Sequence, residues 1–204
     1  LEETYCTNIT PTEYNINRTI LDKVIRKIQI NKSPGNDHII GYWYKHLTSY
    51  RDHLTKIFQQ QLHVDQPLPT WLSTAHTVLL PKTNDTHMAK NYRPIACLNI
   101  MYKLYTSCLN EFLMDHVRRN NIITQEQAAG KKGVWGTVEQ LLINKNILKE
   151  VKSMRRNLIT VWLDYRKAFD SIPHDWLLKA LRLAKVPEHL ITAIKNLTQS
   201  WFTV

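Results

Sequence analysis

The chain has 204 residues, of which 43% are apolar and 22% are charged, the usage of an ordinary globular protein of one domain or slightly more. Five glycines and eight prolines exclude collagen-like and low-complexity classes, and no apolar run is long enough to span a membrane. The net charge of +10 attracts phosphate groups in nucleic acid, a nucleotide or an anionic surface. A basic protein that is merely soluble remains the alternative at this point.

The cysteines and the chain ends bear on the cellular context. Cys6, Cys97 and Cys108 are far apart and none belongs to a C-x-x-C pair, so we expect neither a disulfide framework nor a zinc site. A reducing compartment fits this pattern best. Leu1 stands in place of Met, no secretory signal follows it, and residues 200–204 read as the opening of an apolar element. We therefore expect a piece of a longer polypeptide.

Helices are predicted for the first part of the chain. Thr10 and Pro11 have the pattern of a helix cap and first helical position, and apolar residues then recur at four-residue spacing from Ile16 to Ile28. The segment 32–37 ends this helix because its proline removes a backbone donor.

A second helix is expected over about 39–64, ended by the proline-containing segment 65–69. The β-branched and apolar run 75–81 then predicts a strand, and a polar loop, 82–91, separates it from a second short strand at 92–98. The two strands predict a hairpin, and their prolines favour edge positions.

Further helices and one strong strand follow. Periodicity predicts helices over about 100–117 and, after a glycine-containing loop, a capped helix over 137–154. The nearly continuous apolar run 157–164 predicts a buried strand that ends in a carboxylate. Two helical pieces, 174–185 and 187–199, complete the order. The predicted fold class is α+β, rich in helix.

Two acidic residues near this last strand are catalytic candidates. Asp164 ends the apolar strand, where buried scaffold meets solvent and where α/β enzymes place catalytic groups. Capping of the turn that follows is the simpler role for it. Asp170 is a second acid, and capping of the next helix explains it equally well.

Several cations are candidates for phosphate binding. Lys82 and Arg93 bracket the hairpin loop and could converge on one polyphosphate, Lys as a point charge and Arg as a fork. Solvated cations on edge strands are the alternative. A further basic set suits contact with a phosphate backbone, or simply forms a solvated helix face. Its members are Lys131, Lys132, Lys145, Lys149 and Lys152.

Other common enzyme motifs are missing from the sequence. The nine histidines form no H-x-x-x-H or H-E-x-x-H pattern, which leaves a histidine-rich metal centre without support. No P-loop, dinucleotide-binding or G-x-S-x-G pattern occurs either. Taken singly, the motifs present do not decide the function.

Four segments, taken in order, carry a family resemblance, and the first two lie in the amino-terminal half. Residues 32–37 read K-S-P-G-N-D, and His38 stands where the pattern K-x-S-P-G-x-D-G has its last glycine. Trp71 is followed by V-L-L-P-K at 78–82 and by Y-R-P-I at 92–95, matching a hairpin in which W, I-P-K and Y-R-P-I recur.

The other two segments complete the resemblance. The loop 127–137 stands where the family has Q-x-G-F-R-x-G-x-S-T, but it is divergent and lacks the usual aromatic residue and Arg. Residues 163–170 read L-D-Y-R-K-A-F-D and match L-D-x-x-x-A-F-D. Over about 20–200, the chain resembles the amino-terminal half of the reverse transcriptase domain of non-LTR (LINE-type) retrotransposons.

This resemblance implies the fingers and partial palm of a right-hand polymerase, truncated before the central palm hairpin. It places an N-terminal extension helix in 1–30, the fingers in 31–156 and the beginning of the palm in 157–204. The palm hairpin of the family carries two adjacent aspartates, and no such pair occurs in this sequence. The chain alone is therefore expected to bind nucleic acid weakly, to polymerise nothing, and to leave the strand ending at Asp164 without its palm neighbours.

The resemblance also implies an activity and roles for particular residues. The activity is RNA-directed DNA synthesis from an RNA template, a DNA primer and deoxynucleotides, with two Mg²⁺ ions, or Mn²⁺ as an alternative. It makes Asp164 a metal ligand, Lys82 and Arg93 neutralisers of the triphosphate, and Phe169 the ring that excludes a ribose 2′-hydroxyl. Asp170 keeps a structural role in the turn.

Two alternatives and a cellular setting accompany this interpretation. A group II intron maturase-type polymerase shares the Y-R-P-I and A-F-D motifs, and a non-catalytic basic nucleic-acid-binding module shares the charge. The family further implies that the rest of a polyprotein, with an endonuclease domain as one candidate part, accompanies the chain. It implies a location inside the cell, in the nucleus or a ribonucleoprotein particle, and no membrane partner.

Overall fold

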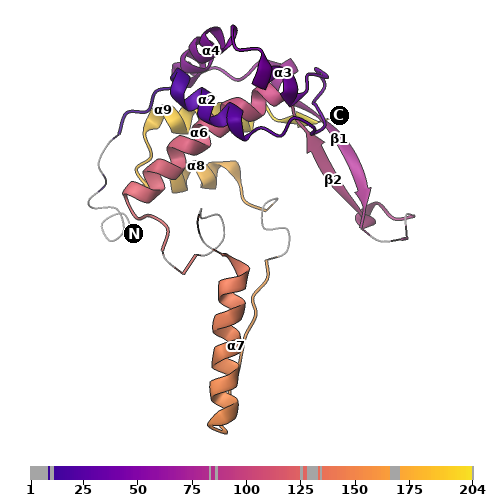
Figure 1. The fold of residues 1–204 in the computed structure, drawn as a ribbon, viewed down its shortest axis with the longest axis vertical. Helices are drawn as coiled ribbons and strands as arrows, with labels where there is room; N and C mark the ends of the chain where they lie inside the picture. The colour runs from indigo at the N-terminus through magenta and orange to yellow at the C-terminus, as the bar shows by residue number, and fades with distance from the viewer. Residues whose placement is uncertain are drawn as a thin grey trace. The chain divides into compact units, whose positions relative to one another are not determined.

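The computed structural model describes residues 12–82, 84–85, 87–124, 126–127, 135–165 and 171–203, together with Ile9 and Gly133. The chain divides into two compact units, Leu1–His116 with Pro173–Val204, and Val117–Ile172. Helices outnumber strands, so the α+β, helix-rich class is confirmed (Figure 1). These two units are defined by how the chain packs. The expected boundaries between the N-terminal extension, the fingers and the palm stay a prediction.

The first unit contains most of the secondary structure. Its elements are α2 (Arg18–Lys27), α3 (Gly41–His46), α4 (Arg51–His63), α5 (Thr70–Ser73), β1 (Thr74–Pro81), η1 (Ala89–Asn91), β2 (Tyr92–Cys97), α6 (Ile100–Arg119, with its last turn in the second unit), α8 (His174–Leu183), α9 (Glu188–Gln199) and β3 (Phe202–Thr203). The second unit contains α7 (Thr137–Ser153). None of the described helices has the length and hydrophobicity of a membrane-spanning segment.

Helix α2 begins later than the sequence predicted. Thr10 and Pro11 lie outside the described residues, and 12–17 are not helical. Asn17 is the cap instead, because its side chain accepts a hydrogen bond from the backbone N–H of Ile20 at 3.0 Å. Ile16, which the periodicity placed in the helix, is buried in the extended segment before it.

The predicted helix over 39–64 is in fact two helices, α3 and α4. Arg51, in the first turn of α4, donates hydrogen bonds from its guanidinium to the carbonyl oxygens of Tyr44 and Lys45 at 3.3 and 2.7 Å. The last carbonyls of a helix lack partners within it, so Arg51 stabilises the break. The same guanidinium pairs with Asp22 of α2 at 2.8 Å. This interaction network explains why the chain turns where sequence periodicity predicted continuity.

The predicted hairpin is confirmed. Strands β1 and β2 pair antiparallel from His76 opposite Cys97 to Pro81 opposite Tyr92. Strand β3 joins the other side of β1 in parallel, which gives the sheet order β2-β1-β3. Pro94 lies on the edge strand β2, where a missing N–H costs no ladder hydrogen bond.

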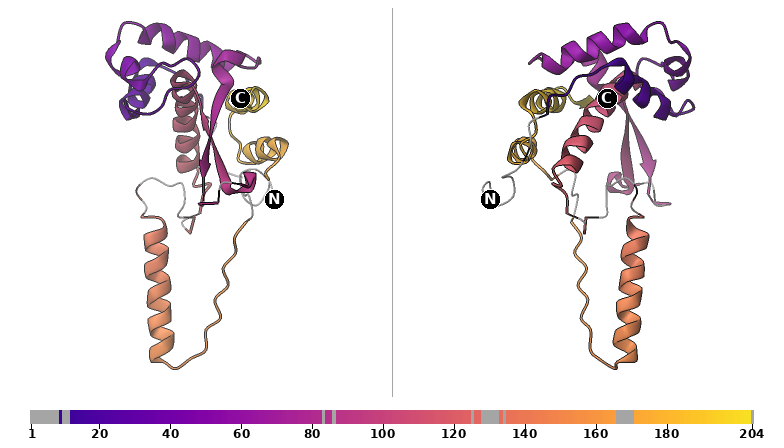
Figure 2. Two further views of the ribbon diagram at one scale, coloured as in Figure 1. Left: turned by 90° about the vertical axis from the view of Figure 1, so that its right-hand side faces the viewer. Right: turned by 60° about the vertical axis from the view of Figure 1, so that its left-hand side comes forward.

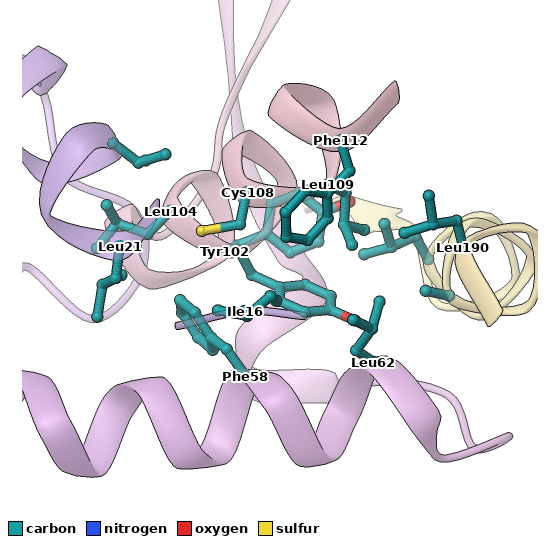
Figure 3. Packing of buried hydrophobic residues seen from close by; sticks show 14 of the residues in the cluster. Ile16, Leu21, Phe58, Leu62, Tyr102, Leu104, Cys108, Leu109, Phe112 and Leu190 are labelled. Atoms are coloured by element: carbon teal, nitrogen blue, oxygen red, sulfur yellow. The ribbon is translucent and has the colours of Figure 1, made fainter. Parts of the chain in front are cut away.

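The core of the first unit is built around α6, whose predicted extent is nearly correct. Its inner face packs against α2, α4 and α9 (Figure 3). Cys108 at the centre is fully buried, and burial raises the pKa of its thiol to about 12. That side chain is a packing residue rather than a nucleophile. The buried residues that Figure 3 labels are Ile16, Leu21, Phe58, Leu62, Tyr102, Leu104, Cys108, Leu109, Phe112 and Leu190.

Helix α7 begins at Thr137, as predicted, but the residue at its cap position is Gly136, so no side chain caps the helix. Gly136 has φ of 59°. A positive φ favours glycine, which has no Cβ to collide with the backbone.

The segment 157–165 is not the buried strand that the sequence predicted. It follows α7 in an extended course (Figure 2), and no described strand pairs with it. Val161 and Trp162 are each 74% exposed and Leu163 is 83% exposed. Apolar side chains of a strand become buried only when a sheet forms around them. The prediction of a buried strand is therefore wrong for this chain.

The loop 32–37 is fastened to the first unit through Asn99, a side chain that is only 1% exposed. The side-chain oxygen of Asn99 accepts a hydrogen bond from the N–H of Asp37 at 3.3 Å, and its amide nitrogen donates to the carbonyl of Trp71 at 2.9 Å. Gly35 lies against the same residue. A Cβ at position 35 would come within 2.6 Å of the carbonyl carbon of Leu98 and closer still to Asn99.

Gly35→Ala is therefore expected to lower the free energy of unfolding by about 1–3 kcal/mol, because the added methyl group forces the loop away from backbone atoms. Urea denaturation followed by circular dichroism measures the change. Ser33→Ala, at an exposed position of the same loop, is the matched control and should leave the midpoint unchanged. Equal stability of the Gly35 variant and the wild type would contradict the close packing.

Candidate active site

Lys82 and Arg93 lie on one face of the β1–β2 hairpin. Arg93 is directly opposite Leu80, and the N–H of Lys82 continues the ladder by donating to the carbonyl of Asn91 at 2.7 Å. Opposite residues share a face, and so do residues two apart on one strand, so both cations point to the same side. Diagonal neighbours of this kind have Cβ atoms about 7 Å apart. The structure thus brings these two predicted residues together.

The surroundings of Lys82 and Arg93 leave both side chains accessible to an anionic ligand. Both are exposed, and no ion pair joins either of them to a carboxylate of the described residues. The Lys82 ammonium donates a hydrogen bond to the carbonyl of Lys90 at 3.4 Å, a weak contact that a phosphate oxygen could replace. Two unneutralised cations on one face suit a polyphosphate group.

Hydrogen bonds order the turn that carries these cations. The side-chain amide of Asn91 donates to the backbone carbonyl of Asp85 at 2.9 Å and to its carboxylate at 3.1 Å. The N–H of Asn91 donates to the carbonyl of Met88 at 2.9 Å and closes the short helix η1. Asp85, Met88 and Asn91 are therefore held to one another at the end of the hairpin.

Further from the turn, the face of the hairpin that carries Lys82 and Arg93 is apolar. Val78, Leu80 and Ile95 are exposed by 40%, 49% and 43%, and the strand register puts them on the side of Lys82 and Arg93. A surface of this kind can contact the uncharged part of a nucleotide while the cations hold its phosphates.

A pocket of about 500 Å³ lies at the base of the hairpin, on the opposite face. The indole N–H of Trp201 donates to the hydroxyl of Tyr102 at 2.5 Å beside it. Burial raises the pKa of Tyr102, and this hydrogen bond opposes the shift. The lining contains no cation, so the pocket does not suit a triphosphate. It is formed by Ser73, Ala75, Ala96, Leu98, Tyr102, Thr106, Trp201, Phe202 and Thr203.

Asp164 belongs to the second unit and is exposed at the end of the extended segment. The basic residues of α7 belong to the same unit. Lys145, Lys149 and Lys152 are all exposed and are spaced by four and three residues, which puts them on one helix face. The remaining predicted site residues lie outside the described residues. These are Lys131, Lys132, Phe169 and Asp170.

Comparison with known proteins identifies the family. The family model described as reverse transcriptase (RNA-dependent DNA polymerase) matches residues 80–203, which include Lys82, Arg93 and Asp164. The chain belongs to the reverse transcriptase family. The resemblance to LINE-type elements is confirmed by the relatives of this reverse transcriptase chain, which come from non-LTR retrotransposons.

Three relatives illustrate the similarity. The Transposon TX1 uncharacterized 149 kDa protein of Xenopus laevis is 24% identical over 185 residues, which cover 88% of this chain and 14% of the relative. The probable RNA-directed DNA polymerase from transposon BS of Drosophila melanogaster is 25% identical, over 78% of this chain and 18% of the relative. The Pol polyprotein from type-1 retrotransposable element R2 of Popillia japonica is 26% identical, over 76% and 20%. The reverse transcriptase chain thus spans a fifth or less of each of them.

The donor chemistry of Asp164 fits a metal ligand of a reverse transcriptase. A carboxylate oxygen is the donor that Mg²⁺ prefers, and this one is exposed and makes no ion pair with a described residue. Among the described residues, no group of three or more His, Cys, Asp or Glu side chains could hold a metal ion. Asp164 therefore fits as one ligand of a site that needs further carboxylates.

The structure shows the roles of two further residues of this reverse transcriptase chain, His38 and Asn99. His38, which replaces the glycine of the family pattern, has φ of 57°, so the backbone there adopts the conformation that favours glycine. Asn99 was not predicted. An Asn directly before a helix is the sequence signal of a helix cap, but here its side chain holds the loop 32–37 instead.

Proposed function

We propose that the chain forms the fingers and the beginning of the palm of a retrotransposon RNA-directed DNA polymerase, which copies an RNA template onto a DNA primer. The observation that carries this proposal is the pair Lys82 and Arg93 on one face of an ordered hairpin, within the segment that matches the family. Two unneutralised cations at this spacing suit the triphosphate of an incoming deoxynucleotide.

The roles of the other residues follow from their chemistry. Asp164 would contribute a carboxylate oxygen to bound Mg²⁺, and Phe169 would press its ring against the sugar where a ribose carries its 2′-hydroxyl. Mg²⁺, when bound, supplies Lewis-acid activation and neutralises charge on the phosphates. Lys82 and Arg93 orient the triphosphate and stabilise its charge, and the lysines of α7 together with Lys131 and Lys132 attract the nucleic-acid backbone. Asp170 would order the turn.

A group II intron maturase-type polymerase and a non-catalytic basic module are the competing assignments. The names of two relatives refer to RNA-directed DNA polymerase or to a Pol polyprotein of a transposable element, which favours a retrotransposon enzyme. The relatives are several times longer than this chain, which supports association with the rest of a polyprotein. An endonuclease domain is one candidate part of that polyprotein. A polymerase of this kind would work in the nucleus or in a ribonucleoprotein particle.

Removing either hairpin cation should weaken nucleotide binding. In the complete polymerase that contains this chain, Lys82→Ala and Arg93→Ala should each raise the apparent KM for deoxynucleotides about ten- to a hundredfold, because each loses a charge-assisted contact. Primer extension at varied nucleotide concentration measures this. Lys179→Ala, an exposed lysine of α8, is the matched control. An unchanged KM in both hairpin variants would leave the two cations without a role in binding nucleotides.

Asp164 should be essential for the chemical step. Asp164→Ala in the complete polymerase should abolish nucleotide incorporation and leave binding of the template almost intact, since the carboxylate acts on the reaction and not on the nucleic acid. Single-turnover extension and a filter-binding assay separate the two effects. Extension at the wild-type rate would refute the assignment and favour the non-catalytic module. Asp170→Ala should be milder.

Phe169 should control the choice of sugar. Phe169→Val removes the ring, so the variant should incorporate ribonucleotides more readily relative to deoxynucleotides. The ratio of kcat/KM for the two substrates measures discrimination. A variant that is less stable in thermal denaturation but discriminates as the wild type does would show that Phe169 is an ordinary packing residue.

A further inference from the structure

Helix α3 presents a cluster of aromatic rings to solvent. Tyr42 and Trp43 are 43% and 51% exposed, and His46 is exposed beside them. The Tyr42 ring lies 4.2 Å from the His46 ring at 33° and 5.5 Å from the Trp43 ring at 86°. We call these three residues the aromatic platform.

The opposite face of α3 is firmly anchored. Tyr44 is 6% exposed, and Gly41 packs so closely that a Cβ there would lie 2.6 Å from Ile28 and 2.9 Å from the carbonyl oxygen of Gln29. Arg51 binds the carbonyls at the end of the helix, as described above. The platform is therefore held by a fixed backbone, and its rings lose little conformational entropy on binding.

The platform lies in a basic part of the chain. Residues 18–63 contain eight Lys and Arg against three Asp and no Glu. Ion pairs join Arg18, Lys23, Lys27 and Arg51 to acidic residues, whereas no described acid pairs with Arg26, Lys32, Lys45 or Lys56. Lys45 lies on α3 itself, and exposed aromatic rings with an unneutralised cation on the same helix are a combination that binds single-stranded nucleic acid.

We propose that the aromatic platform stacks unpaired bases of single-stranded nucleic acid while Lys45 and the other unneutralised cations of this region attract its phosphates. The ring geometry favours splayed bases over a continuous stack, because Trp43 is nearly perpendicular to Tyr42. The site is built on a different element from Lys82 and Arg93, so it adds a contact to the proposed polymerase beyond the nucleotide site. The positive charge favours nucleic acid over a second copy of this basic chain.

The test uses the 204-residue chain and two fluorescently labelled probes of equal charge. One is a 12-nucleotide oligouridylate and the other is an abasic phosphodiester of the same length. Tyr42→Ala and Trp43→Ala should each weaken binding of the oligouridylate about tenfold and leave binding of the abasic probe unchanged, since only the bases stack. Fluorescence anisotropy at constant salt measures both affinities.

Matched variants separate stacking from packing. Trp43→Phe keeps a flat ring and should retain most of the affinity, whereas Trp43→Leu keeps apolar area without a ring and should lose as much as Trp43→Ala. Trp176→Ala removes a tryptophan that is 63% exposed on α8 and should have no effect. Thermal denaturation checks that each variant is folded.

Three outcomes would contradict the proposal that the aromatic platform stacks bases. These are unchanged affinity for oligouridylate in both alanine variants, an equal loss for the abasic probe, or a change in self-association by sedimentation without a change in affinity. The last outcome would identify a protein contact. Probe binding needs neither Mg²⁺ nor a nucleotide, whereas the polymerase assignment is tested by primer extension in the complete polymerase, so failure of the platform and failure of the polymerase assignment are distinguishable.

Discussion

The buried amide of Asn99 connects the parts of the first unit that position the β1–β2 hairpin. One side-chain atom accepts a hydrogen bond from the loop 32–37 and the other donates to Trp71 in α5, which leads directly into β1. Asn99 also follows β2 closely and precedes α6. A buried donor and a buried acceptor left without partners would each cost about 1–3 kcal/mol. The base of the hairpin, and with it the direction of Lys82 and Arg93, therefore depends on this side chain.

Ion pairs with acidic residues neutralise part of the positive charge of the first unit. Glu111, 7% exposed on α6, pairs with Lys23 at 2.7 Å and also with Lys27, both from α2. Asp22 in turn pairs with Arg18 and Arg51. No described acid neutralises the two cations on the hairpin. These acidic residues of the first unit thus hold helices together and leave the surface of the hairpin positive.

Local patterns in the sequence predicted elements that depend on local contacts. The hairpin, α6, α8 and α9 appear close to where periodicity placed them, because each carries its own apolar face or turn signals. The break between α3 and α4 was missed since it depends on Arg51 reaching Asp22, a contact between distant residues. The prediction of a buried strand over 157–165 was wrong because an apolar run becomes a buried strand only when neighbouring strands pair with it. No described strand does so. At the site, Lys82 and Arg93 were found from the hairpin pattern, but Asn99 was not, since its role is to join separate segments.

The parallel pairing of β3 with β1 sets an order of folding. Thr203 reaches Thr77 across 126 residues of chain, whereas the hairpin closes over a short turn. Closing the long loop costs about 2 kcal/mol more in chain entropy than closing the turn. The hairpin can therefore form early, while the chain is still being synthesised, and the side of β1 that receives β3 stays open until α8 and α9 have packed on the core. During that interval a chaperone or another β-edge could pair with Thr74 and Ala75, the residues of β1 that β3 later covers.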